Sequence, residues 1–380
     1  MGTSQALQLD KRYVLVLAMI SKAPGRICLF GDHQDYLELP IIACAINRYI
    51  TIQGMPNGND SLVIHLPDLM EKKVLRFREP ALLAGRSNLN PTKGNHLKTS
   101  LFVVQKYGCL PTQGYDITIQ GDIPINAGLS SSSAMVVAWV HWLFATFGCD
   151  QDITRELIGK VAYEAEVVAQ NAPGGKMDQY TSAIGDMIYL ETDSQSKCRK
   201  IDTPLEGLII GESGVSKNTV GVLGDIKGKS LKAIAMVQKE VSSFKLPLAT
   251  LDSYETYKTI LPIALQPFLY AAIQNHLITQ EAVFALSEKE IDYKNIGRLL
   301  NAHHDVLKNT LKITVPLIDE MIDAALQAGA YGAKIVGSGG GGCICALAPL
   351  DKQQAVVEAI QHAGAKDAYG VQISKGAHIL

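Results

Sequence analysis

The 380-residue sequence lacks an excess of charge of either sign, because 35 lysine and arginine residues face 37 aspartate and glutamate residues, leaving a formal net charge of −2. A chain without a basic field has no compositional support for binding nucleic acid or an anionic membrane surface. It also lacks an apolar run of about 18 residues, the length that a membrane-spanning helix needs. Any phosphate must therefore be recognised locally, by a few residues at one site.

Paired cysteines are lacking as well. The seven cysteines are an odd number, and none stands in a Cys-x-x-Cys pair. Scattered among apolar neighbours, they predict reduced thiols in the core of a cytoplasmic protein, with a disulfide framework as the alternative. Residues 11–23 have a charged start and a short apolar run. We interpret them as leading into a first β-strand and not as a secretion signal, because cleavage after Ala23 would cut into the motif that follows.

Strand patterns are concentrated early in the chain and helical patterns later, which predicts an α+β fold rather than a doubly wound parallel sheet. A polar, proline-terminated stretch at residues 192–204 predicts two domains, residues 1–195 and 196–380, and residues 244–262 are expected to form a loop. The expected strands are residues 13–20, 48–53, 61–65, 115–120, 187–191, 208–212, 334–336 and 343–347. The expected helices are residues 94–107, 131–147, 154–169, 281–286, 293–310, 315–328 and 352–363.

A loop with four consecutive serines opens the helix expected from residue 131. Residues 121–138 read GDIPINAGLSSSSAMVVA and follow a strand-like alternation. Exposed N–H groups at a helix N-terminus make an anion site, and serine hydroxyls can bind Mg²⁺. The alternative is a serine N-cap among other small residues.

Two further glycine-rich segments partly match the sequence patterns of nucleotide-binding loops. Residues 224–230 (GDIKGKS) are one residue short of a Walker A loop and are set aside. Residues 337–342 (GSGGGG) precede a strand pattern, whereas a dinucleotide-binding turn requires a helix. They predict a tight loop between two strands, where the backbone closely approaches either an opposing helix or a ligand.

A charged cluster lies within residues 23–36 (APGRICLFGDHQDY), after a strand-like run. Its charged and titratable members are Arg26, Asp32, His33 and Asp35. Carboxylates accept hydrogen bonds from hydroxyl groups, so the cluster suits a polyhydroxyl ligand; the alternative is a solvated turn. Residues 173–179 (PGGKMDQ) add Asp178, either as another site carboxylate or as a helix cap.

Taken in order, these segments resemble the motifs of the GHMP kinase superfamily, and within it the galactokinases most closely. Residues 25–36 (GRICLFGDHQDY) resemble the galactokinase signature, and residues 124–134 (PINAGLSSSSA) the phosphate loop. Residues 174–180 (GGKMDQY) resemble a third motif of the family, and residues 334–343 (KIVGSGGGGC) resemble its C-terminal glycine motif. Residues 303–325 resemble the helical region that precedes the glycine motif. The resemblance implies a two-domain fold, with an N-terminal ribosomal-protein-S5-like domain, a C-terminal ferredoxin-like domain and the site in the cleft between them.

The resemblance implies a monomer or weak homodimer that transfers the ATP γ-phosphoryl group to a sugar, galactose at its anomeric hydroxyl being the leading candidate. Asp178 matches the catalytic aspartate, and Arg26 the arginine that stabilises developing charge. Ser132 and Glu166 match the Mg²⁺ ligands. The implied substrate-binding residues are Asp32, His33, Asp35, Gly175 and Asp178. The implied ATP-binding residues are Asn126, Ala127, Gly128, Leu129, Ser130, Ser131 and Ser132.

The sequence departs from the galactokinase pattern at several places. Cys28 replaces the usual asparagine, Phe30 the usual isoleucine or valine, and Asn126 a glycine. The loop after Tyr36 is three residues shorter, and the expected sugar-contacting tyrosine falls near Gly224. Another sugar, a uronic acid, a heptose or mevalonate therefore remains an alternative acceptor, as does a catalytically silent sugar sensor. A decarboxylase acting on a mevalonate derivative is disfavoured by the GDHQDY cluster.

Overall fold

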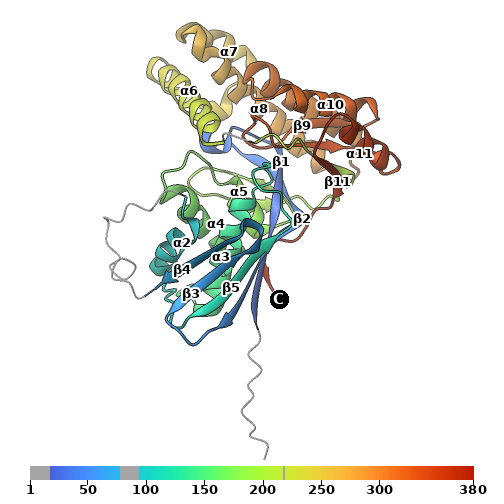
Figure 1. Cartoon of the computed structure of the whole chain (residues 1–380). Helices are drawn as coiled ribbons and strands as arrows, with labels where there is room; N and C mark the ends of the chain where they lie inside the picture. The colour runs from blue at the N-terminus through green and yellow to red at the C-terminus, as the bar shows by residue number, and fades with distance from the viewer. Residues whose placement is uncertain (1–17, 78–93, 217–218) are drawn as a thin grey trace, which may run out of the picture.

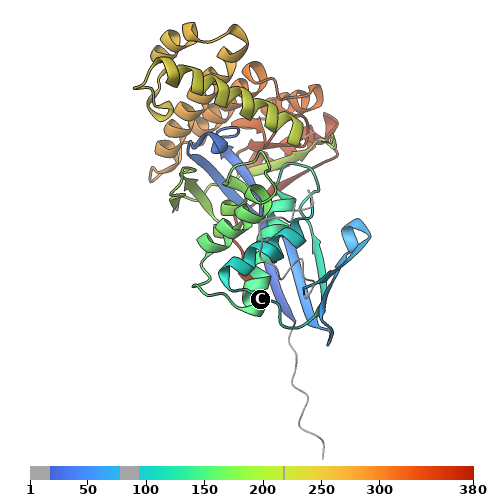
Figure 2. The same ribbon diagram turned by 90° about the vertical axis from the view of Figure 1, so that its left-hand side faces the viewer.

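The computed structural model describes residues 18–77, 94–216 and 219–380. Its strands form two sheets, and its helices pack against them (Figures 1 and 2). The described chain is thus an α+β fold, as the sequence predicts. Among the described residues, no helix combines the length and apolar character needed to cross a membrane.

The first sheet has eight strands in the order β12-β1-β2-β5-β3-β4, with β6 beside β2 and β7 beside β6. All its pairings are antiparallel except that between β3 and β5. Its strands are β1 (Met19–Phe30), β2 (Ile41–Pro56), β3 (Ser61–Leu66), β4 (Glu71–Arg76), β5 (Tyr115–Gly121), β6 (Met187–Leu190), β7 (Cys198–Lys200) and β12 (His378–Ile379).

The second sheet is antiparallel and has the order β11-β8-β10-β9. Its strands are β8 (Leu208–Glu212), β9 (Gly332–Ile335), β10 (Cys343–Leu347) and β11 (Asp367–Val371). Residues 337–342 lie between β9 and β10, so the glycine-rich segment is the predicted loop between two strands.

The earlier helices lie with the first sheet, and the later ones pack on the second sheet or on one another (Figure 1). The earlier helices are α2 (His96–Val104), α3 (Ser131–Phe147), α4 (Arg155–Tyr163), which continues into a π-helical turn (Glu164–Val168), and α5 (Met177–Ile184). The later helices are α6 (Thr219–Glu240), α7 (Leu251–Tyr257), α8 (Gln266–Leu286), α9 (Tyr293–Asp305), which continues into a second π-helical turn (Val306–Thr310), α10 (Pro316–Gln327) and α11 (Gln353–His362). Of these, α9, α10 and α11 pack on the second sheet, and α6 and α7 pack on α8.

Helix α3 is buried along most of its length, as its mostly apolar sequence requires. Trp139 and Trp142 are fully buried and stack with ring centroids 5.4 Å apart. A side chain at Gly54 on β2 would overlap the Trp142 ring, so the strand can approach the helix only with glycine at this position. This packing holds α3, whose N-terminal end follows the serine-rich loop, against the first sheet.

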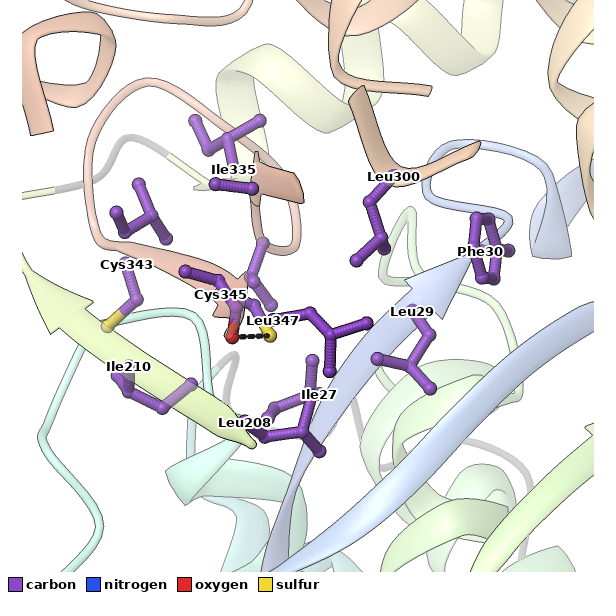
Figure 3. Close-up of a cluster of buried hydrophobic side chains, with 14 of the residues drawn as sticks. Ile27, Leu29, Phe30, Leu208, Ile210, Leu300, Ile335, Cys343, Cys345 and Leu347 are labelled. Carbon is purple, nitrogen blue, oxygen red and sulfur yellow. Dashed lines mark hydrogen bonds between the residues drawn. The ribbon is translucent and has the colours of Figure 1, made fainter. Parts of the chain in front are cut away.

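One of the hydrophobic clusters joins the two sheets. Ile27 and Leu29 on β1 belong to the same buried cluster as Leu208 and Ile210 on β8 and Cys345 on β10 (Figure 3). Strand β1 therefore contributes to the first sheet by its hydrogen bonds and to the second domain by its side chains. The candidate site residues at the end of β1 are held between the two sheets.

Several expected elements differ from those observed. Strand β1 continues to Phe30, so Arg26 lies on a strand and not in a turn; most of the strand expected at residues 13–20 lies outside the described residues. Residues 244–262 are not simply a loop, because they contain α7. Residues 224–230 lie inside α6, which the sequence did not predict, and α8 begins at Gln266 rather than near residue 281.

The division into residues 1–195 and 196–380 stays a prediction. Strand pairing departs from it at two places, because β7 joins the first sheet and β12 returns to pair with β1.

Candidate active site

The end of β1 delivers a buried arginine to the site. Nε and Nη2 of Arg26 each lie 2.7 Å from Oδ1 of Asp178, and Nη1 donates to the Gly128 carbonyl at 2.6 Å. Burial, the largest single influence, would lower the pKa of Arg26, but Asp178 together with Cys28 and Asp32 outweighs burial and the pKa is raised. A side chain at Gly25 would press against the Leu129 carbonyl at 2.9 Å, so glycine lets the strand pack on the loop.

The serine-rich loop is built around two residues in the left-handed region, Asn126 (φ 59°) and Ser130 (φ 62°). Ser130 stands at the N-cap position of α3, but its side chain does not cap the helix. Its hydroxyl instead donates to Oδ2 of Asp178 at 2.7 Å. The simple serine N-cap alternative therefore does not describe Ser130. The first N–H groups of α3 have no acceptor within the helix, and Ser131 lines the cavity where they begin.

A hydroxyl and a carboxylate meet beside this loop. Ser132 Oγ donates to Oε1 of Glu166 at 2.7 Å, and the side-chain amide of Gln179 donates to Oε2 at 2.7 Å. Glu166 lies in the π-helical turn after α4, a deformation found frequently at functional sites.

In the described parts of the chain, no three His, Cys, Asp or Glu side chains converge to hold a metal. A magnesium ion beside the loop could take the Ser132 hydroxyl and the Glu166 carboxylate as ligands. This small set of hard oxygen ligands suits an ion that is also bound by phosphates and water.

Asp32 is engaged on both oxygens. Oδ2 pairs with the fully buried Lys334 ammonium at 2.5 Å, and Oδ1 accepts from the Gly337 N–H at 2.8 Å. Burial alone would raise the pKa of Asp32, but Lys334 and the other polar neighbours lower it to about 2. This carboxylate joins the β1 turn to the glycine loop of the second domain, so its observed partners are protein groups rather than an open space for sugar hydroxyls.

His33 and Asp35 complete this end of the site. His33 is left-handed (φ 63°), and its ring nitrogens lie 3.0 Å from the Tyr36 hydroxyl and 3.2 Å from the Ser338 carbonyl oxygen. Asp35 accepts from the backbone N–H of Tyr36 at 2.9 Å. Burial, reinforced by the nearby Asp178 carboxylate, raises the pKa of Asp35 to about 6.

One cavity of about 420 Å³ brings most of these groups together. The expected site residues that line it are Arg26, Asp32, His33, Asp35, Asn126, Gly128, Ser130, Ser131, Ser132, Glu166, Gly175 and Asp178. Ala127 and Leu129 do not line it; they are buried under the loop.

The cavity has further lining residues that the sequence did not assign to the site, although most of them lie in segments that it singled out. They are His96, Ser133, Val167, Ala172, Pro173, Gly174, Met177, Gln179, Leu223, Gly337 and Ser338. Leu223 comes from α6 and precedes Gly224, near which the resemblance leads us to expect a tyrosine. Gln179 lies within the matched MDQ stretch and could have been found from it. No sequence signal points to His96 or Leu223.

Three family models match the chain, and their segments together cover more than half of it. They are the galactokinase galactose-binding signature (residues 13–56), the GHMP kinases N terminal domain (residues 95–186) and GHMP kinases C terminal (residues 282–366). Their order along the chain is that of the motifs in the sequence.

Mevalonate kinases and galactokinases are both similar to this chain over nearly its whole length. Mevalonate kinase from Thermococcus sibiricus is 28% identical over 92% of this chain and 94% of its own length. Galactokinase from Actinobacillus succinogenes is 28% identical over 94% of this chain and 93% of its own length.

Solved structures have the same fold. A galactokinase from Lactococcus lactis complexed with galactose superposes with a TM-score of 0.83 at 20% identity, covering 96% of this chain and 95% of that one. The mevalonate kinase of Methanococcus jannaschii gives a TM-score of 0.69 at 22% identity, covering 94% of this chain and 99% of that one.

Proposed function

Since this chain belongs to the GHMP kinase family and is a galactokinase-like phosphotransferase with an alcohol acceptor, we propose that it transfers the γ-phosphoryl group of ATP to a monosaccharide. Galactose, phosphorylated at its anomeric hydroxyl, is the leading acceptor. ATP occupies the end of the cavity formed by the serine-rich loop, and the sugar occupies the end formed by the β1 turn.

The observation that carries the proposal is the charge balance of the cavity. Arg26 is the only described lysine or arginine side chain that lines it, and Arg26 is already paired with Asp178. Within the described residues Asp35 makes no ion pair, although Arg26 lies near enough to act on its charge. A neutral polyol can donate hydroxyls to Asp35, whereas the carboxylate of mevalonate or of a uronic acid would face like charge. The balance therefore favours a neutral sugar.

Each step of the proposed phosphoryl transfer has a residue in the cavity that can perform it. Asp178, held by Arg26 and by the Ser130 hydroxyl, orients the acceptor hydroxyl and takes its proton. The N–H groups at the start of α3 hold phosphate oxygens. Ser132 and Glu166 are the residues that would hold Mg²⁺, which when bound neutralises charge on the phosphates.

Mevalonate is the second candidate acceptor, because a mevalonate kinase is as similar to this chain as a galactokinase is. A silent sugar-binding relative is disfavoured. Such a protein does not need the pairs Arg26–Asp178 and Ser132–Glu166, and here both pairs are present and hydrogen bonded.

A coupled assay for ADP release tests the proposal. The purified chain with Mg²⁺ and ATP is offered galactose, its C4 epimer glucose, other aldoses, uronic acids, heptoses and mevalonate. We expect one neutral sugar to exceed its epimers by orders of magnitude in kcat/KM, because an ill-matched hydroxyl leaves buried polar groups unpaired. Turnover of mevalonate alone would replace the sugar with mevalonate, and no ADP release with any acceptor would overturn the kinase proposal.

A further inference from the structure

His96 lines the cavity but lies outside every motif discussed above. It is in the first turn of α2, and its Nδ1 lies 2.7 Å from Nε2 of Gln170. The orientation of the Gln170 amide is fixed by a backbone group, because the Gly94 N–H donates to Oε1 at 2.9 Å. The Gln170 amide oxygen must therefore face the Gly94 N–H, which leaves the Gln170 NH₂ group facing His96.

This arrangement determines which nitrogen of the His96 ring carries the proton. An amide NH₂ group only donates, so Nδ1 of His96 accepts. In a neutral imidazole, the other nitrogen then bears the hydrogen. His96 is thus held as the tautomer with an Nε2–H donor, and no hydrogen bond within the described residues is recorded for that nitrogen.

The same amide ties His96 to one end of the cavity. Nε2 of Gln170 also contacts the Ala165 carbonyl oxygen at 3.4 Å. Ala165 immediately precedes Glu166, whose carboxylate accepts from Ser132. His96 is therefore tied to the turn that carries Glu166, whose carboxylate accepts from the serine-rich loop.

We propose that His96 is a further nucleotide-binding residue, whose Nε2–H donates to a phosphate oxygen of ATP, and that Gln170 is the positioning residue that holds the donating tautomer. This inference rests on the proposed function, since it requires ATP at the serine-rich loop. The hydrogen bond adds a directed donor to the loop N–H groups without adding a fixed positive charge.

The test is direct binding of ATP, ADP and adenosine to the full chain in the presence of Mg²⁺, measured by calorimetry without acceptor. His96→Ala should weaken ATP and ADP binding roughly 10-fold, the usual effect of losing a hydrogen bond to a charged group, and leave adenosine binding unchanged. In turnover, KM for ATP should rise while KM for the sugar stays the same. Lys98→Ala, on the same helix but outside the cavity lining, is the matched control and should bind ATP normally.

Two more variants separate the role of the donor from the role of the ring. His96→Phe keeps an aromatic ring but has no N–H, so it should lose as much phosphate affinity as His96→Ala and serves if the alanine variant does not fold. Gln170→Leu should lose less ATP affinity than His96→Ala. Added to His96→Ala, it should cause no further loss of ATP affinity. Equal ATP affinity in His96→Phe and the parent chain, or equal losses of ATP and adenosine affinity, would overturn the inference. Failure of the parent chain itself to bind ATP would instead count against the proposed function.

Discussion

The carboxylate of Asp35 occupies the volume that a side chain at Gly175 would need. Asp35 follows β1, and Gly175 lies in the loop before α5, so two distant segments meet only because one residue has no Cβ. The proposed sugar end of the cavity is shaped by this missing side chain.

Gly175→Ala should therefore raise KM for the sugar at least about 10-fold, because the new methyl group displaces the Asp35 carboxylate. KM for ATP should change little. Gly174→Ala is the matched control, since its Cβ would meet only Val167, at an ordinary 3.6 Å. Steady-state kinetics on both variants check this. A Gly175→Ala enzyme with an unchanged sugar KM would remove Asp35 from the sugar site.

Asp35→Asn should stabilise the fold at neutral pH. The folded chain raises the pKa of Asp35 from 3.8 to about 6, so between these values the folded state binds more protons than the unfolded state. The free energy of unfolding therefore falls as pH rises through this window. Above the window the ionised Asp35 carboxylate destabilises the folded chain by roughly 1–3 kcal/mol. Melting curves should give the variant a higher Tm than the parent near neutral pH, with the gain vanishing below about pH 4.

Asp32→Asn should have the opposite effect, which makes it the control for Asp35→Asn. The folded pKa of Asp32 is lowered to about 2, so its stabilisation is present above the ordinary value of 3.8 and is lost as pH falls toward 2. Asparagine would also leave the buried Lys334 ammonium without its counter-charge, which lowers Tm at neutral pH. Parallel pH dependences for the two variants would contradict both assignments.

Asp178→Asn should lower kcat by roughly 10²-fold or more, because a positioned proton acceptor and the partner of Arg26 are lost together. KM values for ATP and sugar should change much less. Asp186→Asn makes the same chemical change in an exposed ion pair with Lys200 and should retain the parent kcat. Near-normal turnover in Asp178→Asn would leave Asp178 with a purely structural role.

Ser132→Ala and Glu166→Ala should each raise the Mg²⁺ concentration needed for half-maximal rate. Because the two side chains contact each other at 2.7 Å, their effects should be strongly non-additive in the double variant. Rate titrations with Mg²⁺ for the parent, both single variants and the double variant measure this. Additive losses at an unchanged Mg²⁺ requirement would argue against a shared metal.

Local periodicity predicted some elements to the residue. The predicted helix over residues 131–147 and the predicted strand over residues 208–212 coincide with α3 and β8, because both are buried and their apolar patterns are uninterrupted. Helix α6 was missed because it contains three glycines, which disfavour helix by propensity. Side chains at Gly224 and Gly228 would meet nothing, so these glycines face open space while the buried Ala233 and Val237 hold the helix in place.

The site was predictable where its motifs are contiguous in sequence and not where its contacts cross the chain. Arg26 and Asp178 lie in recognisable segments, and the structure brings them together. Asp32 and Lys334 are 302 positions apart in the sequence, and the local sequence around either residue does not predict its pairing with the other. The fully buried lysine appears in the sequence as an ordinary strand residue, so the fate of both Asp32 oxygens could only be learned from the fold.

The return of β12 to β1 bears on the order in which the protein can fold during synthesis. Ser21 and Lys22 on β1 pair with residues 378–379, and the N–H of Ala377 donates to the carbonyls of Ser182 and Ala183 on α5. The first sheet, and the helix that carries Asp178, are thus completed by residues translated after the entire second domain. A ribosome-bound nascent chain that ends before residue 370 lacks this edge strand and its contacts with α5, so the first sheet is completed only after the later helices have emerged.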